Sequence, residues 1–223
     1  MNGFFVTGTG TDVGKTYVTA QIIIAMQKLG YRTGYYKAAL SGALRVDESL
    51  VPGDAQYAKQ AAKLSNEQVI VSHVYEPALS PHLASKLTHL PFSLEKVARD
   101  AAILGTYCDR IIAEGAGGII CPLSMDEEPI LLEDVIRLLD LPLILVADAG
   151  LGTINATVLS TYYAKARHMP LAGIILNRFD EADIMHQDNK KVIEQLTGIK
   201  VIACIKEHGS ITDVEAFAKQ TCN

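Results

Sequence analysis

The sequence predicts an α/β fold, with a mostly parallel central sheet and helices on both faces, of the P-loop NTPase-like kind. Short apolar runs alternate with helical stretches along the chain, which is typical of βαβ units joined by right-handed crossovers. A glycine-rich loop that ends in Gly14-Lys15-Thr16 lies between the first apolar run and the first helical stretch. The 223 residues, of which 49% are hydrophobic, fit one such domain over residues 1–223.

The predicted strands are apolar stretches that cover residues 4–6, 32–37, 69–73, 110–114, 143–147, 171–176 and 200–204. The predicted helices cover residues 17–29, 55–64, 93–104, 133–139, 183–196 and 213–219, and one more follows Asn155 and ends near His168. Gly30 ends the first helix as a C-terminal cap, and Ser93 begins the third as an N-cap. Residues 43–53 and 76–82 are expected to be loops, because prolines exclude regular helix from the second.

Charge and composition indicate a protein that acts on small molecules. A net charge of −5 and a pI near 5.7 argue against a nucleic-acid partner or an anionic membrane surface. We find no apolar run near the ~20 residues of a membrane span and no signal peptide, so a cytoplasmic location is expected. The cysteines are scattered without a Cys-x-x-Cys pair, so thiols are expected at Cys108, Cys121, Cys204 and Cys222.

The loop Gly8-Thr-Gly-Thr-Asp-Val-Gly-Lys-Thr16 has the context of a phosphate-binding loop. Backbone N–H groups at the start of a helix face an anion, and the helix dipole favours negative charge there. Lys15 can reach the β- and γ-phosphates of a nucleotide, and the Thr16 hydroxyl can bind Mg²⁺. Five residues separate Gly8 from Gly14 where the standard motif has four, so the loop is a variant.

Polar or glycine-rich residues also follow other predicted strands, near Lys37, Glu114, Asp148 and Asn177. Ligands of parallel α/β sheets bind beyond the carboxyl ends of the strands. We therefore expect these residues and the phosphate loop at one edge of the sheet.

Each candidate residue has a purely structural alternative. Asp54 could cap a helix or bind a metal. Glu114 could be a salt-bridged structural residue or, with Thr16 and Asp54, a ligand of Mg²⁺, which takes one or two carboxylates together with phosphate oxygens and water. Lys37 could be a solvated lysine, but its place beside the phosphate loop favours a second phosphate clamp. Ser41 and residues like it more often bond within their own loops.

Several motifs together resemble the dethiobiotin synthetase family over nearly the whole chain. The family pattern G-T-x-T-[DE]-V-G-K-T matches residues 8–16, including the additional loop residue, and K-P-x-x-S-G matches residues 37–42 with Ala38 in place of proline. Three further motifs match at Ser80-Pro81-His82, at residues 114–118 (Glu-Gly-Ala-Gly-Gly) and at residues 151–155 (Leu-Gly-Thr-Ile-Asn).

The resemblance implies an ATP- and Mg²⁺-dependent cyclo-ligase that forms C–N bonds. 7,8-Diaminopelargonate and CO₂ would give dethiobiotin, ADP and phosphate through a carbamate and a carbamic-phosphoric anhydride. By this resemblance the catalytic residues are Lys15, Lys37 and Thr11. The nucleotide and its metal would bind Asp12, Val13, Gly14, Lys15, Thr16, Tyr17, Asp54, Glu114, Gly115, Ala116, Gly117, Asn177 and Arg178, with Thr16, Asp54 and Glu114 on Mg²⁺.

The resemblance also implies a homodimer in which the second subunit helps to hold the substrate carboxylate. The substrate would contact Thr11, Ser41, Pro81, Leu151, Gly152, Thr153 and Asn155, the last four from the partner subunit. Backbone N–H groups before the following helix suit an anion.

The chain departs from the family pattern where the nucleotide base is expected to bind. An acidic residue commonly follows the asparagine, whereas this chain has Asn177-Arg178. A Pro-x-Leu stretch is usual near the last strand, whereas this chain has Ile205-Lys206-Glu207-His208. We therefore expect weaker or broader base selectivity, with ATP as the default nucleotide.

Other hypotheses about the function fit the motifs less well. A ParA/MinD-like ATPase switch has the same sheet but needs a signature lysine early in the loop, and no lysine precedes Lys15 there. Related amide-forming ligases carry a glutaminase domain, for which 223 residues leave no room. A module that only binds a nucleotide would not need Lys37 or the Ser80-Pro81-His82 motif.

Overall fold

The centre of the protein is a seven-stranded sheet in the order β11-β10-β9-β1-β6-β2-β5, in which all neighbouring strands are parallel. The structure is a computed structural model that describes residues 1–126, 128–211 and 217. The strands of this sheet are β1 (Gly3–Gly8), β2 (Thr33–Ser41), β5 (Val69–Tyr75), β6 (Arg110–Glu114), β9 (Leu143–Asp148), β10 (Leu171–Asn177) and β11 (Val201–Ile205). The predicted parallel α/β fold is confirmed.

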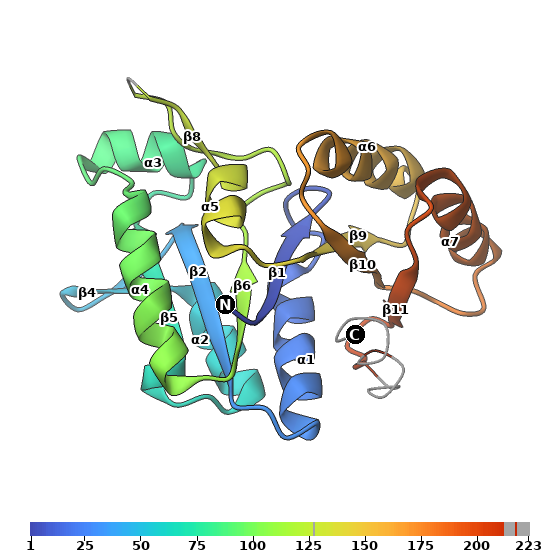
Figure 1. Ribbon diagram of the computed structural model, residues 1–223, viewed down its shortest axis with the longest axis horizontal. Helices are drawn as coiled ribbons and strands as arrows, with labels where there is room; N and C mark the ends of the chain where they lie inside the picture. The colour runs from blue at the N-terminus through green and yellow to red at the C-terminus, as the bar shows by residue number, and fades with distance from the viewer. Residues whose placement is uncertain (127, 212–216, 218–223) are drawn as a thin grey trace.

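Helices cover both faces of the sheet, as Figure 1 shows. They are α1 (Lys15–Lys28), α2 (Gly53–Ala62), α3 (Pro81–Thr88), α4 (Leu94–Tyr107), α5 (Leu132–Leu139), α6 (Thr153–Ala166) and α7 (Ile184–Thr197), with a short 3₁₀ turn at Asn66–Gln68. Neighbouring residues of β1 point to opposite faces: Phe4 and Val6 pack with α1 and α2, and Phe5 packs with α4 and α5. Both faces of β1 are therefore buried, which explains its continuous apolar sequence.

Two predicted helix starts agree with the capping geometry, whereas α6 begins at Thr153 and not after Asn155 as predicted. The Ser93 side chain accepts a hydrogen bond from the Lys96 backbone N–H at 3.1 Å, as its N-cap role requires. Asp183 caps α7 by accepting from the Met185 N–H at 2.7 Å. The last predicted helix, residues 213–219, lies outside the described residues apart from Phe217, which is buried.

The predicted end of the second strand is wrong, because β2 continues four residues past Lys37 to Ser41. Lys37 lies inside the strand and faces Glu114, the last residue of β6, in the strand register. A charged residue usually ends a buried strand. Here the carboxylates of Asp54 and Glu114 neutralise the lysine, so the strand can continue.

Two predicted loops contain regular structure. Residues 43–53 hold an antiparallel hairpin, β3 (Leu44–Val46) and β4 (Ser49–Val51), with Asp47 in the left-handed conformation at its turn. Residues 76–80 are irregular as predicted, but α3 begins at Pro81, where a missing N–H costs nothing because the first helical turn has no acceptor for it. A second small hairpin joins β7 (Pro122–Ser124) and β8 (Ile130–Leu131).

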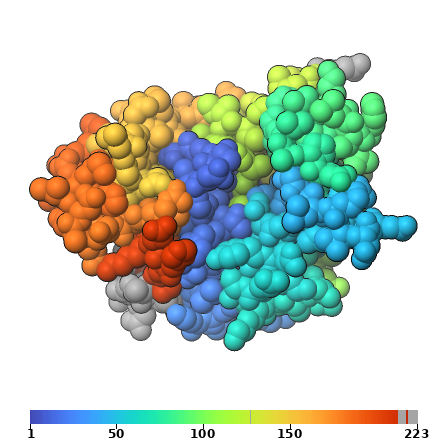
Figure 2. All heavy atoms as spheres, turned by 180° about the vertical axis from the view of Figure 1, so that it is seen from behind, coloured from blue at the N-terminus to red at the C-terminus, as the bar shows by residue number. Residues whose placement is uncertain are grey.

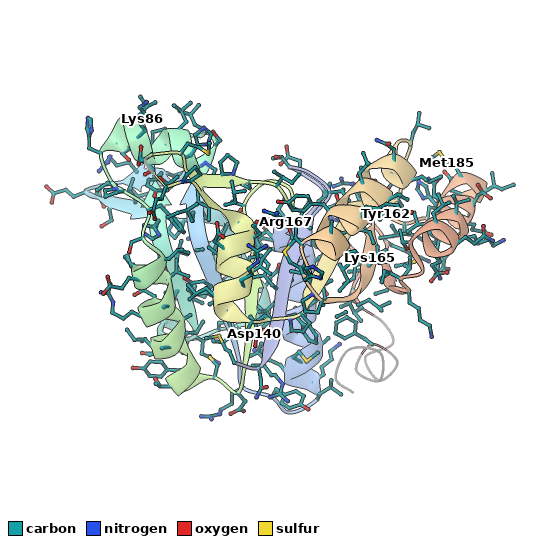
Figure 3. The ribbon with its side chains drawn as sticks, turned by 45° about the horizontal axis from the view of Figure 1, so that its top comes forward. Lys86, Asp140, Tyr162, Lys165, Arg167 and Met185 are labelled. Atoms are coloured by element: carbon teal, nitrogen blue, oxygen red, sulfur yellow. The ribbon has the colours of Figure 1, made fainter. Side chains whose placement is uncertain are left out.

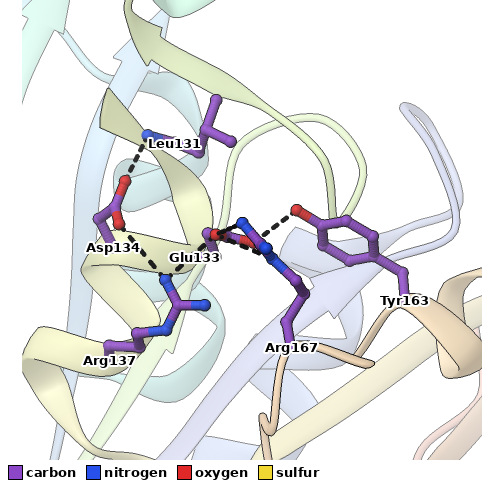
Figure 4. Close-up of polar contacts among 6 residues, drawn as sticks. All are labelled: Leu131, Glu133, Asp134, Arg137, Tyr163 and Arg167. Atoms are coloured by element: carbon purple, nitrogen blue, oxygen red, sulfur yellow. Dashed lines mark hydrogen bonds and ion pairs between the residues drawn. The ribbon is translucent and has the colours of Figure 1, made fainter. Parts of the chain in front are cut away.

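A buried carboxylate joins α5 to α6. The Glu133 side chain is 3% exposed and accepts hydrogen bonds from Arg167, Arg137 and the Tyr163 hydroxyl (Figure 4). The Arg167 guanidinium is the main reason that the pKa of Glu133 falls to about 2. Glu133 is therefore ionised at neutral pH and links the two helices.

No helix among residues 1–126 and 128–211 combines the length and apolar character that crossing a membrane requires. The described cysteines, Cys108, Cys121 and Cys204, are free thiols, as predicted.

Candidate active site

A cavity of about 820 Å³ lies beyond the carboxyl ends of β1, β2 and β6. Its walls come from the phosphate loop, the end of β2, the first turn of α2, the start of α3 and the loop after β6. The predicted site residues that line it are Thr11, Asp12, Gly14, Lys15, Thr16, Lys37, Ser41, Asp54, Pro81, Glu114, Ala116 and Gly117. These residues lie far apart in the sequence, and the parallel sheet brings them to one edge as predicted.

The phosphate loop connects β1 directly to α1. Gly14 is the N-cap residue of α1 in the left-handed conformation (φ 89°), and a Cβ atom at this position would lie 2.1 Å from the Asn177 Nδ2 atom. Only glycine fits there. The Lys15 ammonium donates a hydrogen bond to the Gly10 carbonyl at 2.7 Å, so the lysine lies along the inside of the loop. Burial, together with the nearby Lys37, lowers the pKa of Lys15 against the opposing effect of Glu114.

A cation lies between two carboxylates next to the loop. The Lys37 Nζ atom is 2.5 Å from Asp54 Oδ2 and 2.6 Å from Glu114 Oε1. Burial alone would lower the pKa of Lys37, but Glu114 and Asp54 outweigh it and raise the pKa above its ordinary value. Lys37 is thus a charged residue at neutral pH although it is only 4% exposed. The reading of Lys37 as a solvated lysine is wrong.

Glu114 also binds the phosphate loop. It accepts hydrogen bonds from the Thr16 hydroxyl at 2.8 Å and from the Tyr35 hydroxyl at 2.9 Å. Asp54 does not cap α2, because Pro52 holds the N-cap position and no side chain caps the helix there. The capping alternative for Asp54 is therefore wrong, and its side chain turns to Lys37.

The donor set of Thr16, Asp54 and Glu114 fits Mg²⁺. It supplies one hydroxyl and two carboxylates, all hard oxygen ligands, and the three groups belong to one hydrogen-bonded network through Lys37. Within the described part of the chain, no three His, Cys, Asp or Glu side chains gather to hold a metal. Mg²⁺ takes one or two protein carboxylates together with phosphate oxygens and water, and Asp54 and Glu114 offer two carboxylates here.

The far wall of the cavity carries an unpaired hydroxyl. Ser41 Oγ is buried and has no hydrogen-bond partner among the described residues, so it does not bond within its own loop. Pro81 lines the same wall with four other residues of the matched motifs, Ala39, Leu40, Gly42 and Ser80. Ala78, Leu79 and Cys121 also line it and belong to no matched motif. Most of these residues are small or apolar. The wall combines an apolar surface with one free polar atom.

The remaining predicted site residues do not line this cavity. Val13 is buried in the core, and the Gly115 N–H donates to the Val6 carbonyl of β1. Asn177 and Arg178 contact the outside of the phosphate loop, and the Tyr17 hydroxyl donates to the Gly209 carbonyl. The predicted substrate contacts before and within α6 are also elsewhere, at Leu151, Gly152, Thr153 and Asn155.

Comparison with solved structures shows the fold alone. The chain is similar to a ParA family ATPase from Chlorobium tepidum, with a TM-score of 0.55, 16% identity and coverage of 99% of this chain and 91% of the other. It is also similar to a putative plasmid partition protein from Borrelia burgdorferi (TM-score 0.60, 10% identity, 98% and 97% coverage). MinD from Pyrococcus furiosus matches with a TM-score of 0.55, 18% identity and 99% and 97% coverage. At sequence identities this low, structural similarity supports the fold but does not indicate an activity.

Comparison of sequences identifies the family. A family model described as an AAA domain matches residues 2–215. The ATP-dependent dethiobiotin synthetase BioD of Clostridium botulinum (strain Loch Maree) is 44% identical over 210 residues, which are 94% of this chain and 92% of the relative. The protein of the same name from Clostridium novyi (strain NT) is 46% identical over 206 residues, 92% and 87% of the two chains. The loop, the Lys37 motif and these near full-length matches agree, and the chain belongs to the ATP-dependent dethiobiotin synthetase family.

Proposed function

We propose that this protein is an enzyme that uses ATP and Mg²⁺ to carboxylate 7,8-diaminopelargonate and close the ureido ring of dethiobiotin. The observation that carries the proposal is the contact of Lys37 with both Asp54 and Glu114 inside a cavity that the phosphate loop borders. Family membership names the substrate, and the cavity supplies the groups that phosphoryl transfer needs. The proposed location is the cytoplasm.

The phosphate loop is the proposed site of the ATP phosphates. The N–H groups at the start of α1 favour an anion, and the Lys15 ammonium, which bonds the Gly10 carbonyl, would turn to the phosphates when ATP binds. Thr16, Asp54 and Glu114 would hold Mg²⁺, which when bound neutralises phosphate charge. Lys37 adds a second fixed cation at the same end of the cavity. We infer that Lys15, Lys37 and the metal together would stabilise the transferring γ-phosphoryl group.

The diamine is placed on the other wall. One amine takes up CO₂ as a carbamate, and a carbamate oxygen attacks the γ-phosphorus while the bond to ADP breaks. The second amine then attacks the carbamoyl carbon, phosphate leaves and the ring closes. Ser41 Oγ supports this placement, because a buried hydroxyl without a protein partner can bond a carbamate or an amine. Thr11 also lines the cavity, and we propose that it contacts the same group.

Little covalent chemistry is left to the protein in this scheme. The amines, the carbamate and ATP supply every bond that forms or breaks. The side chains hold the reactants in line and neutralise charge, and fixed geometry of this kind supplies most of the acceleration in phosphoryl transfer. The positions of Lys37 and Glu114, both almost fully buried, are consistent with a preorganised site.

We further propose that the active form is a homodimer in which α6 lies at the interface. Asn155, Leu159 and Tyr162 recur at intervals of four and three residues, so they share one face of α6, and Leu151 lies in the turn just before the helix. Leu151 is 95% exposed, Leu159 61% and Tyr162 59%, so large apolar side chains are exposed on this helix face and in the turn before it. Figure 3 shows the side chains of this helix, with Tyr162 labelled. A second copy that covers this face would bring the backbone N–H groups near Gly152 and Thr153 towards the substrate carboxylate.

One incubation tests the proposed activity. The purified protein is mixed with 7,8-diaminopelargonate, bicarbonate, ATP and Mg²⁺, and dethiobiotin is sought by mass. Omission of the diamine, of ATP, or of Mg²⁺ by chelation should each abolish the product. If the complete mixture gives ATP hydrolysis without dethiobiotin, the proposed reaction is wrong.

A further inference from the structure

Two side chains at the end of β10 bind the phosphate loop from outside the cavity. The Asn177 Nδ2 group donates to the Val13 carbonyl at 3.1 Å, and the Arg178 Nη2 group donates to the Asp12 carbonyl at 3.0 Å. Figure 2 shows the blue N-terminal segment at the surface beside the yellow and orange segment that contains β9, α6 and β10. Arg178 and Asp12 are 166 residues apart in the sequence, and Asn177 and Val13 are 164 apart, so the fold brings distant segments together at this loop.

These contacts determine which way the loop N–H groups point. The peptide unit is planar and trans, so its N–H points opposite to its carbonyl. The Asp12 carbonyl shares its peptide unit with the Val13 N–H, and the Val13 carbonyl shares its unit with the Gly14 N–H. Holding both carbonyls towards β10 therefore turns both N–H groups away from β10. Two left-handed residues, Asp12 (φ 61°) and Gly14 (φ 89°), make this arrangement of the loop possible.

Arg178 is itself held in place by a carboxylate from the neighbouring strand. Its Nε atom lies 2.8 Å from Asp148 Oδ2, and its Nη2 atom contacts the same oxygen. The other oxygen of Asp148 accepts from the Gly150 N–H at 3.1 Å, so the carboxylate cannot turn freely. The guanidinium is a rigid planar fork, and two of its donors on Asp148 fix the direction of the donor that reaches Asp12.

We propose that Arg178 is a positioning residue for the phosphate loop: held by Asp148, it orients the Asp12–Val13 peptide so that the loop N–H groups bind the nucleotide phosphates. The inference rests on the proposed function only in taking a nucleoside triphosphate as the ligand. It differs from a role in the base pocket, because the contacts of Arg178 are with the loop backbone and Asp148. Arg178 therefore contributes to the affinity for phosphate, whatever base the nucleotide carries.

Nucleotide binding, measured without the diamine, distinguishes a role of Arg178 in positioning the phosphate loop from a role in the base pocket. The dissociation constants of Mg²⁺-ATP, Mg²⁺-GTP, Mg²⁺-CTP and Mg²⁺-tripolyphosphate are measured by calorimetry for the wild type and for Arg178→Ala. A half-buried charged donor to a carbonyl is worth about a tenfold change in affinity. We expect all four constants to rise by about this factor, and the ratios among the nucleotides to stay unchanged.

Further variants and a matched control sharpen the result. Asp148→Asn removes the charge that holds Arg178 and should weaken all four ligands by a smaller common factor. Arg178→Lys should not restore binding fully, because an ammonium cannot reproduce the two-sided contact. Arg32→Ala breaks a more exposed Arg–Asp pair, with Asp109, at the amino ends of β2 and β6, and should leave all four constants unchanged.

Kinetics add a second readout. In the dethiobiotin assay, Arg178→Ala should raise the KM for ATP by about tenfold and leave the KM for the diamine unchanged, since the substrate wall is untouched. An affinity loss confined to one base would assign Arg178 to the base pocket and overturn the proposal. Unchanged affinity for all four ligands in folded Arg178→Ala, or a wild type that binds none of them, would overturn it too. Because calorimetry needs no diamine, failure of dethiobiotin formation leaves this test intact.

Discussion

Replacing Lys37 by alanine should nearly abolish dethiobiotin formation while the fold persists. The change removes a cation that is 4% exposed and contacts both Asp54 and Glu114. Glu114, 2% exposed, then loses its ion pair with Lys37. Breaking one side of a buried ion pair costs about 3–5 kcal/mol of folding free energy. Glu114 keeps the hydrogen bonds from Thr16 and Tyr35, so we expect the lower end, about 3 kcal/mol.

The two effects of this change can be measured separately. For a chain of this size, a loss of ~3 kcal/mol lowers Tm by roughly 6–12 °C, which scanning calorimetry detects. Loss of one fixed charge at the developing phosphoryl charge lowers kcat by about 10²–10³-fold. Turnover is therefore assayed well below the reduced Tm, where the variant is folded.

A second ion pair provides the control. Lys96→Ala on α4 breaks the contact of Lys96 with Asp100, whose side chain is 11% exposed, on a helix that does not line the cavity. This variant should lose stability but keep kcat. Lys37→Met, which retains the apolar part of the side chain, should be as inactive as Lys37→Ala. Unchanged turnover in folded Lys37→Ala would remove Lys37 from the mechanism.

Other predictions concern the loop, the ion pairs, the dimer and the base. Gly14→Ala should abolish nucleotide binding in calorimetry, because its Cβ would meet the Asn177 side chain at 2.1 Å; wild-type affinity would refute the geometry of the loop. Glu133 has a pKa of about 2 in the folded protein, so its contribution to stability is complete above its ordinary pKa and disappears as the pH falls towards 2. Glu133→Gln should therefore lower Tm at pH 7 and flatten the pH dependence of Tm below pH 4.5, whereas parallel curves would contradict this. Leu159→Asp should shift the sedimentation coefficient from dimer to monomer, and an unchanged dimer would place the interface elsewhere. Turnover with ATP, GTP and CTP should differ only modestly if base selectivity is broad, and strict dependence on ATP would refute that expectation.

Local sequence patterns predicted most, but not all, of the helices and strands. The apolar runs and the Ser93 cap indicated most strands and helices, because burial on both faces and capping are properties of neighbouring residues. The hairpin at Leu44–Val51 and the helix from Pro81 were missed. Exposed strands of three residues carry almost no periodicity, and a proline marks a helix start and a loop equally well.

The phosphate loop, the parallel sheet and the end of the sheet at which the cavity lies could be predicted from short motifs and from the direction of the strands. The position of Lys37 within a strand could not, because the carboxylates that make this possible are 17 and 77 residues away in the sequence. The contacts of Arg178 with Asp148 and with the loop backbone also depend on residues that are distant in the sequence. The energy of a buried charge depends on its partners in space, and no local pattern of residues contains them.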